Sequence, residues 1–158
     1  MKSEPDVKEP PSRGQQLGCF AMVTILLLGL LLVAISVWRL NATVMQFEEQ
    51  FSGDDWTRIE GPDIHEQEVV TTPTLFFGGD ITLHGATADI AILGGDAKLQ
   101  GTYTKNVHFL GRHLDVAENA RIDGNLIITA GKHVTIRGHV SGAIEGQWDR
   151  LFSATSSP

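Results

Sequence analysis

The sequence is poor in cysteine and, over its second half, in proline. Cys19 is the only cysteine among 158 residues, which excludes a disulfide within the chain and a metal site built from cysteines. No proline lies between Pro73 and Pro158. Because proline lacks the N–H group that a β ladder needs, this absence suits a segment whose residues pair with neighbouring strands. Stability must therefore come from burial and backbone hydrogen bonds.

The motifs of the common enzyme classes are also missing. The sequence contains no Gly-x-Ser-x-Gly, no Gly-Lys-Ser and no His-Glu-x-x-His, and no helix that would bind phosphate follows Gly94-Gly95-Asp96. Aspartates near the ends of β segments are favoured because they bond nearby backbone. We predict no catalytic residue, no cofactor site and no metal site, and we do not expect an enzyme. The aspartates interpreted in this way are Asp80, Asp89, Asp96, Asp115 and Asp123.

One long apolar run is present. Residues 14–38 carry no charge and no proline and are dense in Leu, Ile and Val. An α-helix needs about 20 apolar residues to cross a bilayer core about 30 Å thick, so we predict a transmembrane helix at 17–40. The run exceeds the roughly 7–15 residues of a signal-peptide core, which favours a retained anchor over a cleaved signal. Residues 1–16, rich in Pro, Ser, Glu and Lys, are expected to be disordered.

Charge on either side of this run predicts its orientation. Lys2, Lys8 and Arg13 precede it, whereas after Arg39 there is no basic residue until Arg58. Basic residues concentrate on the cytoplasmic side of a membrane. We therefore expect a single-pass protein with its N-terminus in the cytoplasm and its C-terminal domain outside, and the lipid bilayer is the first predicted partner.

Acidity is confined to the segment that follows the apolar run. The chain has a net charge of −7. Eight acids and one base lie between Glu48 and Glu68, whereas from Val69 onward eight acids face seven bases. We interpret 41–72 as an acidic juxtamembrane linker, with a loop at 52–73. No basic patch stands out, which argues against nucleic acid as a partner.

Apolar residues keep a helical spacing just beyond the run. Leu40, Val44, Phe47 and Phe51 fall at i, i+4, i+7 and i+11, which is one face of a helix. Two interpretations stay open. The segment is half-ordered, which we favour, or it is a helix that packs on a neighbour or lies on the lipid surface.

From about Phe76 the pattern changes to short β segments punctuated by glycine. The unit apolar-x-apolar-x-Gly recurs at short intervals, as in residues 80–85, 107–111 and 133–138. A strand with two inward side chains spans about 10 Å at 3.3 Å per residue, which suits one side of a coil in a β-solenoid. We predict such a β-helix at 73–150, of four or five coils, followed by a tail at 151–158.

Alternation along these segments predicts which side chains fill the interior of the coils. A pattern of period two places every second residue on the same face of a strand. The predicted interior set is Ile81, Leu83, Ile90, Ile92, Leu99, Val107, Phe109, Leu114, Val116, Ile122, Leu126, Ile128, Val134, Ile136, Val140 and Ile144.

Histidines are the residues in the repeats most suited to metal binding. His84, His108 and His133 fall on outward positions by alternation, and histidines stacked on adjacent coils could bind a metal. We nevertheless interpret them as surface or corner residues. The full set is His65, His84, His108, His113, His133 and His139.

Aromatic and aliphatic residues flank the repeats. Phe76 and Phe77 precede the first expected coil, and Trp148, Leu151 and Phe152 follow the last. A solenoid must cap or pair the backbone at its two ends. These side chains are either caps, or one end stays open and stacks on another subunit.

The segment 80–146, with its Val-Thr-Ile-Arg-Gly unit at Val134–Gly138, resembles the bactofilins, which are bacterial polymer-forming scaffold proteins. The resemblance implies a right-handed β-helix with three short sheets. It also implies stacking into filaments without nucleotide, often beneath the membrane and close to cell-wall synthesis. A weaker likeness to the hexapeptide-repeat acyltransferases, which have left-handed β-helices, rests on the six-residue steps between Ile122, Ile128, Val134 and Val140.

We therefore expect an all-β fold, a short right-handed β-helix (β-solenoid) preceded by one transmembrane α-helix. The leading functional hypothesis is a self-associating, bactofilin-like scaffold or cytoskeletal protein of the bacterial inner membrane, related to cell shape or the cell envelope. The alternative is a non-polymerising binding module or accessory subunit of an envelope complex, with an envelope protein as partner. A hexapeptide-type acyltransferase is the third hypothesis.

Overall fold

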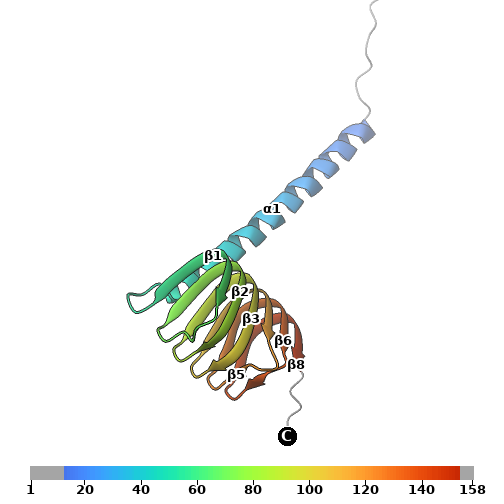
Figure 1. The fold of residues 1–158 in the computed structure, drawn as a ribbon. Coiled ribbons are helices and arrows are strands. Elements are labelled where there is room, and N and C mark those ends of the chain that lie inside the picture. Colours follow the sequence, from blue (N-terminus) through green and yellow to red (C-terminus); the bar gives the residue numbers. More distant parts are fainter. Residues whose placement is uncertain (1–12, 154–158) are drawn as a thin grey trace, which may run out of the picture. The chain divides into compact units, whose positions relative to one another are not determined.

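The computed structural model of the chain describes residues 13–153 (Figure 1). The chain divides into two compact units, Met1–Ala42 and Thr43–Pro158. Of the tail expected to be disordered at 1–16, residues 1–12 lie outside the described part, whereas residues 13–16 are helical. The elements are α1 (Arg13–Gln50), β1 (Thr57–Glu66), β2 (Thr74–Ala86), β3 (Ile90–Tyr103), β4 (Val107–Val116), β5 (Arg121–Ile122), β6 (Leu126–Ile136), β7 (His139–Val140) and β8 (Ile144–Ser153).

Helix α1 is continuous over 38 residues and contains no proline. Its part Thr24–Gln50, with a mean hydropathy of 2.1, is long and apolar enough to cross a membrane. The leucines between Leu26 and Leu32 are 57–60% exposed, a surface that is unfavourable in water and suited to hydrocarbon. The helix continues to Gln50, beyond the end predicted at residue 40.

The residues after Trp56 wind into a β-solenoid, as predicted (Figure 1). Its strands pair in parallel in the order β1-β2-β3-β4-β6-β8, and the short β5 and β7 continue the pairing from the end of β3. Six coils are stacked, more than the four or five predicted, and equivalent positions of successive coils lie 16 to 19 residues apart. Equivalent positions in successive coils are Thr57, Thr74, Ile90, Val107, Leu126 and Ile144.

Strand β1 forms a coil in the segment that was expected to be a loop within an acidic linker, and that expectation is wrong. It pairs with β2 from Thr57↔Thr74 to Glu66↔Leu83. Ile64 is buried in the core and Ile59 packs against it, whereas the acids Glu60 and Asp63 are exposed. Glu60 and Asp63, two of the eight acids that suggested a linker, therefore lie on the outer face of a strand.

The interior of the coils is filled largely by the predicted side chains. All those from Ile81 to Ile136 are buried, and Val140 and Ile144 are half-buried because they lie near the end of the stack. Burying one such side chain contributes about 1.5–3 kcal/mol before the entropy of ordering the chain is offset. The core also includes Tyr103, whose hydroxyl donates to the carbonyl oxygen of Leu83 at 2.9 Å and whose pKa is raised by burial.

A column of glycines lets successive coils approach closely at one bend. Gly61, Gly78, Gly94 and Gly111 pair in register. A Cβ atom on Gly94 would lie 2.6 Å from the carbonyl oxygen of Gly78. Any side chain at this position would therefore force the coils apart.

Side-chain hydrogen bonds fix a second corner. Three side-chain oxygens each accept a hydrogen bond from a backbone N–H of the next coil. The Oδ1 atom of Asp89 accepts from Asn106 at 3.0 Å, that of Asn106 from Asn125 at 3.0 Å, and that of Asn125 from Ala143 at 2.9 Å. Asp89 thus bonds the backbone of the next coil, whereas the sequence suggested a bond within its own turn. Each such bond contributes about 1 kcal/mol and keeps the coils in register.

The last coil takes in residues that were expected beyond the β-helix. Strand β8 extends to Ser153, so residues 151–153 of the predicted tail are strand, and 154–158 lie outside the described part. Trp148 belongs to β8 and packs against the core, whereas Phe76 is fully buried in the second coil. These aromatic residues therefore do not flank the repeats.

Candidate interaction surfaces

The end of α1 packs on the outer face of β2, β3 and β4. Phe51 is central to this contact, because its ring lies 4.8 Å from the rings of Phe47 and Trp56 and 4.7 Å from that of His108. Glu48 also forms an ion pair of 2.5 Å with Arg58 of β1. We call the buried residues of this contact the helix-end cluster: Phe47, Phe51, Leu75, Ala91, Leu93 and Leu110.

This contact decides between the two interpretations of the apolar stripe after the membrane run. The favoured interpretation, a half-ordered segment, is wrong, because Phe47 and Phe51 are 2% and 4% exposed. Val44 packs against the same cluster, whereas Leu40 is exposed. The part of the stripe from Val44 to Phe51 therefore packs on the solenoid of its own chain.

His108 lies at the edge of the helix-end cluster, half-buried against Phe51. Burial lowers the pKa of His108 from its ordinary value of 6.5, and the negative charge of Asp89 opposes this shift. The imidazole is therefore neutral at pH 7. It acts here as a packing residue, in contrast to the surface role that the sequence suggested.

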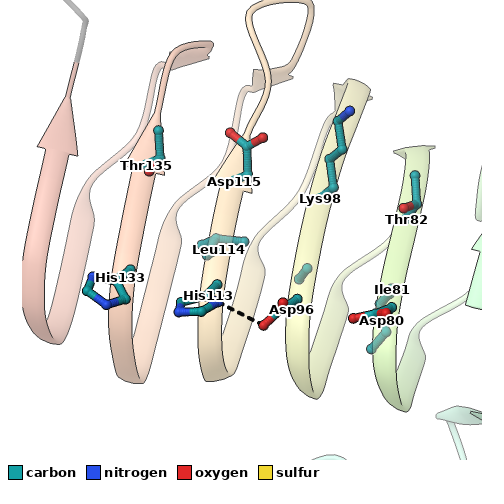
Figure 2. Close-up of a pocket in the computed structure, with 11 residues that line it drawn as sticks. Asp80, Ile81, Thr82, Asp96, Lys98, His113, Leu114, Asp115, His133 and Thr135 are labelled. Atoms are coloured by element: carbon teal, nitrogen blue, oxygen red, sulfur yellow. Dashed lines mark ion pairs between the residues drawn. The ribbon is translucent and has the colours of Figure 1, made fainter. Parts of the chain in front are cut away.

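An open groove of about 450 Å³ runs across the outer face of β2, β3, β4 and β6 (Figure 2). Two rows of side chains line it, because paired positions on adjacent coils point the same way. One row consists of Asp80, Asp96, His113 and His133, and the other of Thr82, Lys98, Asp115 and Thr135.

Two carboxylates of the groove, Asp96 and Asp115, form ion pairs within the groove or with its rim. Asp96 accepts from Arg112 at 3.0 Å and from the Nδ1 atom of His113 at 2.9 Å. Both oxygens of Asp115 accept from Arg137, at 2.9 and 2.6 Å, and this carboxylate raises the pKa of Arg137. All these pairs are exposed, so each contributes little to stability.

The groove lacks the geometry of a nucleophilic or metal centre. Within residues 13–153, no hydrogen bond joins the hydroxyl of Thr82 or Thr135 to a base, as an activated nucleophile requires. The rings of His113 and His133 are stacked at 5.0 Å. Among the described residues, no group of three or more His, Cys, Asp or Glu side chains could hold a metal ion.

The structure also places the remaining histidines that were considered as ligands. The Nδ1 atom of His84 lies 3.0 Å from the carbonyl oxygen of Glu66, and His65 and His139 are exposed. The histidines that stack on adjacent coils are His113 and His133. Sequence alternation could not find this pair, because the coils differ in length by up to three residues.

The two ends of the solenoid expose unpaired strand edges. Strand β1 pairs only with β2, and β8 only with β6, among the described residues. No residue of β8 is buried, and Phe152 and Leu151 are 79% and 38% exposed. A row of free N–H and C=O groups beside apolar side chains is a template for pairing with another strand.

Comparison of the chain with protein-family models, with curated proteins and with solved structures gives no match. The resemblance to bactofilins therefore stays a prediction.

Proposed function

We propose that this chain is a membrane-anchored scaffold protein whose β-solenoid associates with other copies through its open ends. The observation that carries the proposal is the exposed last strand, β8, with its free backbone edge and the apolar side chains of Leu151 and Phe152. The apolar helix supports membrane attachment. Confinement to a membrane would raise the local concentration of copies and so favour weak contacts.

The resemblance of residues 80–146 to bactofilins, which are polymer-forming scaffolds of the bacterial envelope, is consistent with this role. The chemistry of such a protein would be backbone pairing between coils of different copies.

The test is the mass of the full chain in detergent micelles, measured by light scattering over a concentration series. Growth of the complexes with concentration is expected, and Phe152→Asp should shift them towards monomers, because a charge would replace the exposed apolar ring. Lys105→Asp is the control, since Lys105 is exposed at a lateral corner between β3 and β4. A full chain that stays monomeric at every concentration would contradict the proposal.

The orientation of the chain in the membrane is tested in a separate experiment. The basic residues before the apolar run place the solenoid outside the cytoplasm in our proposal. A reporter that is active only outside the cytoplasm, fused after Pro158, is expected to be active. Activity of a reporter that works only in the cytoplasm would instead place the solenoid beneath the membrane.

The groove of Figure 2 favours a second candidate function, a non-polymerising binding module of an envelope complex. Its rows of ionisable side chains offer both donors and acceptors to a polar partner. A strictly monomeric full chain that retains an envelope protein on purification would favour this candidate. Loss of that protein in Lys98→Asp would assign the contact to the groove.

A further inference from the structure

Some outward positions of the solenoid form columns that run from the first coil to the last. One column begins at Arg58 of β1 and ends at Glu145 of β8. Another begins at Asp63 and ends at Arg150. The members between these ends are Leu75, Ala91, His108 and Ile127 in the first column, and Asp80, Asp96, His113 and His133 in the second.

Both columns therefore have opposite charges at their two ends. The first is basic at β1 and acidic at β8, and the second is acidic at β1 and basic at β8. The groups of the second column are the more available, because neither Asp63 nor Arg150 forms an ion pair within residues 13–153. Arg58 is already paired with Glu48 and Glu60.

We infer that the partner of each solenoid end is the opposite end of a second copy, docked head to tail. Strand β8 of one copy pairs in parallel with β1 of the next, so that Glu145 continues the column of Arg58 and Arg150 continues the column of Asp63. This inference rests on the proposed function and adds the polarity and register of the contact. An end-to-end contact of unlike surfaces repeats without closing, so it generates an open filament.

The register places complementary groups together across the junction. Adjacent strands lie about 4.8 Å apart, so Arg150 of one copy would lie beside Asp63 of the next, and Glu145 beside Arg58. Leu151, which continues the interior column of Val134, would meet the position occupied by Ile64. The junction would thus bury an apolar side chain that is 38% exposed in the single chain.

Pro62 does not oppose this pairing. A proline in a strand removes one N–H donor from the ladder. It sits at the bend of β1, at the position equivalent to Gly79 of β2, and the paired register between β1 and β2 skips this position. Gly79 and Gly95 are skipped in the same way between β2 and β3. The missing donor therefore falls where the coils make no ladder pair.

The competing arrangement joins like ends about a two-fold axis. Antiparallel pairing of two β8 strands could place Glu145 opposite Arg150, and two β1 strands could place Arg58 opposite Asp63. We favour the head-to-tail contact because every strand pair in the solenoid is parallel. The two arrangements respond in opposite ways to an exchange of charges.

The first experiment exchanges the charges of Asp63 and Arg150 in the full chain, with the concentration-dependent mass as readout. Asp63→Arg and Arg150→Asp alone should each raise the dissociation constant about 5-fold, because an exposed pair becomes a like-charge contact. The double variant should return to within about 2-fold of the natural chain. Lys105→Asp, an exposed charge at a lateral corner, is the control and should change nothing.

A double variant that associates more weakly than either single variant would overturn the inference. In the two-fold arrangement the carboxylate introduced by Arg150→Asp would face Glu145, and the guanidinium introduced by Asp63→Arg would face Arg58. The exchange would then add repulsion at both ends. The proposed function would survive that result, because association itself would remain. If the natural chain never associates, both the proposed function and the head-to-tail inference are contradicted.

A second experiment locates the contact by disulfide formation in membranes. In a Cys19→Ser background, one tagged chain carries Asp63→Cys and a differently tagged chain carries Arg150→Cys. Within one chain these positions are five coil spacings apart, about 24 Å, which is beyond the limit of about 7 Å for a disulfide. We expect a crosslink between the two chains and none between identical chains. Crosslinks of Arg150→Cys to Glu145→Cys chains alone would establish the two-fold contact.

Discussion

The solenoid interior and the helix-end cluster are two apolar clusters built on different rules. The interior takes its residues from inward positions of all six coils, so each coil repeats the contribution of the one before. The helix-end cluster occupies outward positions of β2, β3 and β4, and the end of α1 covers them. The interior holds the coils together, whereas the helix-end cluster holds one segment against a finished stack. Substitutions in the interior should therefore unfold the solenoid, whereas substitutions in the helix-end cluster should release the end of α1 from the strands.

The largest expected effect comes from a charge in the interior. Ile136→Asp should unfold the solenoid, because a fully buried side chain would become an unpaired carboxylate. Circular dichroism of the full chain should lose its β signal while the helical signal of α1 remains. Thr129→Asp, an exposed position of the same strand, is the control. A β-rich Ile136→Asp chain would show that the interior is wrongly assigned.

A smaller and more local effect is expected in the helix-end cluster. Phe51→Ala removes a ring that contacts Phe47, Trp56 and His108, at a cost of about 3–5 kcal/mol for this contact. Hydrogen exchange should become fast in residues 44–56 and stay slow in the strands. Met45→Ala, on the exposed side of the helix, should leave exchange unchanged. Fast exchange throughout the strands would mean that the two clusters do not act separately.

A substitution that strains the backbone should lower the stability of the solenoid by less than the substitutions at Ile136 and Phe51. Gly101 has a φ of +72°, and a Cβ atom there would clash with the carbonyl oxygen of His84. Gly101→Ala should destabilise the solenoid by about 1–2 kcal/mol from the left-handed conformation alone, with the close contact adding to this. Thermal unfolding is the measurement. Gly53→Ala, which meets no atom within 4 Å, should behave like the natural chain.

The smallest effect is a dependence of the helix-end cluster on pH. The pKa of His108 is lowered in the folded state, chiefly by burial, from its ordinary value of 6.5. The unfolded segment therefore binds the proton more readily, so the stability contributed by the neutral ring is present above pH 6.5 and is lost as the pH falls below it. The protection factors of the amides in residues 44–56, which allow for the slower intrinsic exchange at lower pH, should fall on acidification, and less so in His108→Gln. An equal fall in both chains would assign the effect to other groups.

The alternation of apolar and polar residues was sufficient to predict the interior of the solenoid, because a strand that buries one face carries apolar residues at every second position. The positions from Ile81 to Ile136 were correctly assigned without knowledge of coil length. The first coil was missed because the Gly-Asp-Asp, Gly-Pro and Thr-Thr-Pro breaks at 53–55, 61–62 and 71–73 suggested a loop. Its signal was present in the spacing of Ile59-x-Gly61-x-Asp63-Ile64, which Phe76-x-Gly78-x-Asp80-Ile81 repeats.

The strands beneath the helix-end cluster also have a recognisable sequence pattern, which differs from simple alternation. Residues 90–93 and 107–110 are apolar or half-apolar at nearly every position, which is typical of strands buried on both faces. What covers the outer face could not be predicted, because that depends on how far the helix continues. The groove was beyond prediction for a related reason, since the meeting of His113 with His133 depends on coils of unequal length.

The shared register has a consequence for how such a chain can change in evolution. Gain or loss of one full turn, such as the 17 residues from Thr57 to Pro73, keeps inward side chains inside the solenoid and outward side chains outside it. Gain or loss of a single residue within a strand would reverse inside and outside for the rest of that strand. The domain can therefore grow or shrink by whole turns while its terminal strands are inherited intact.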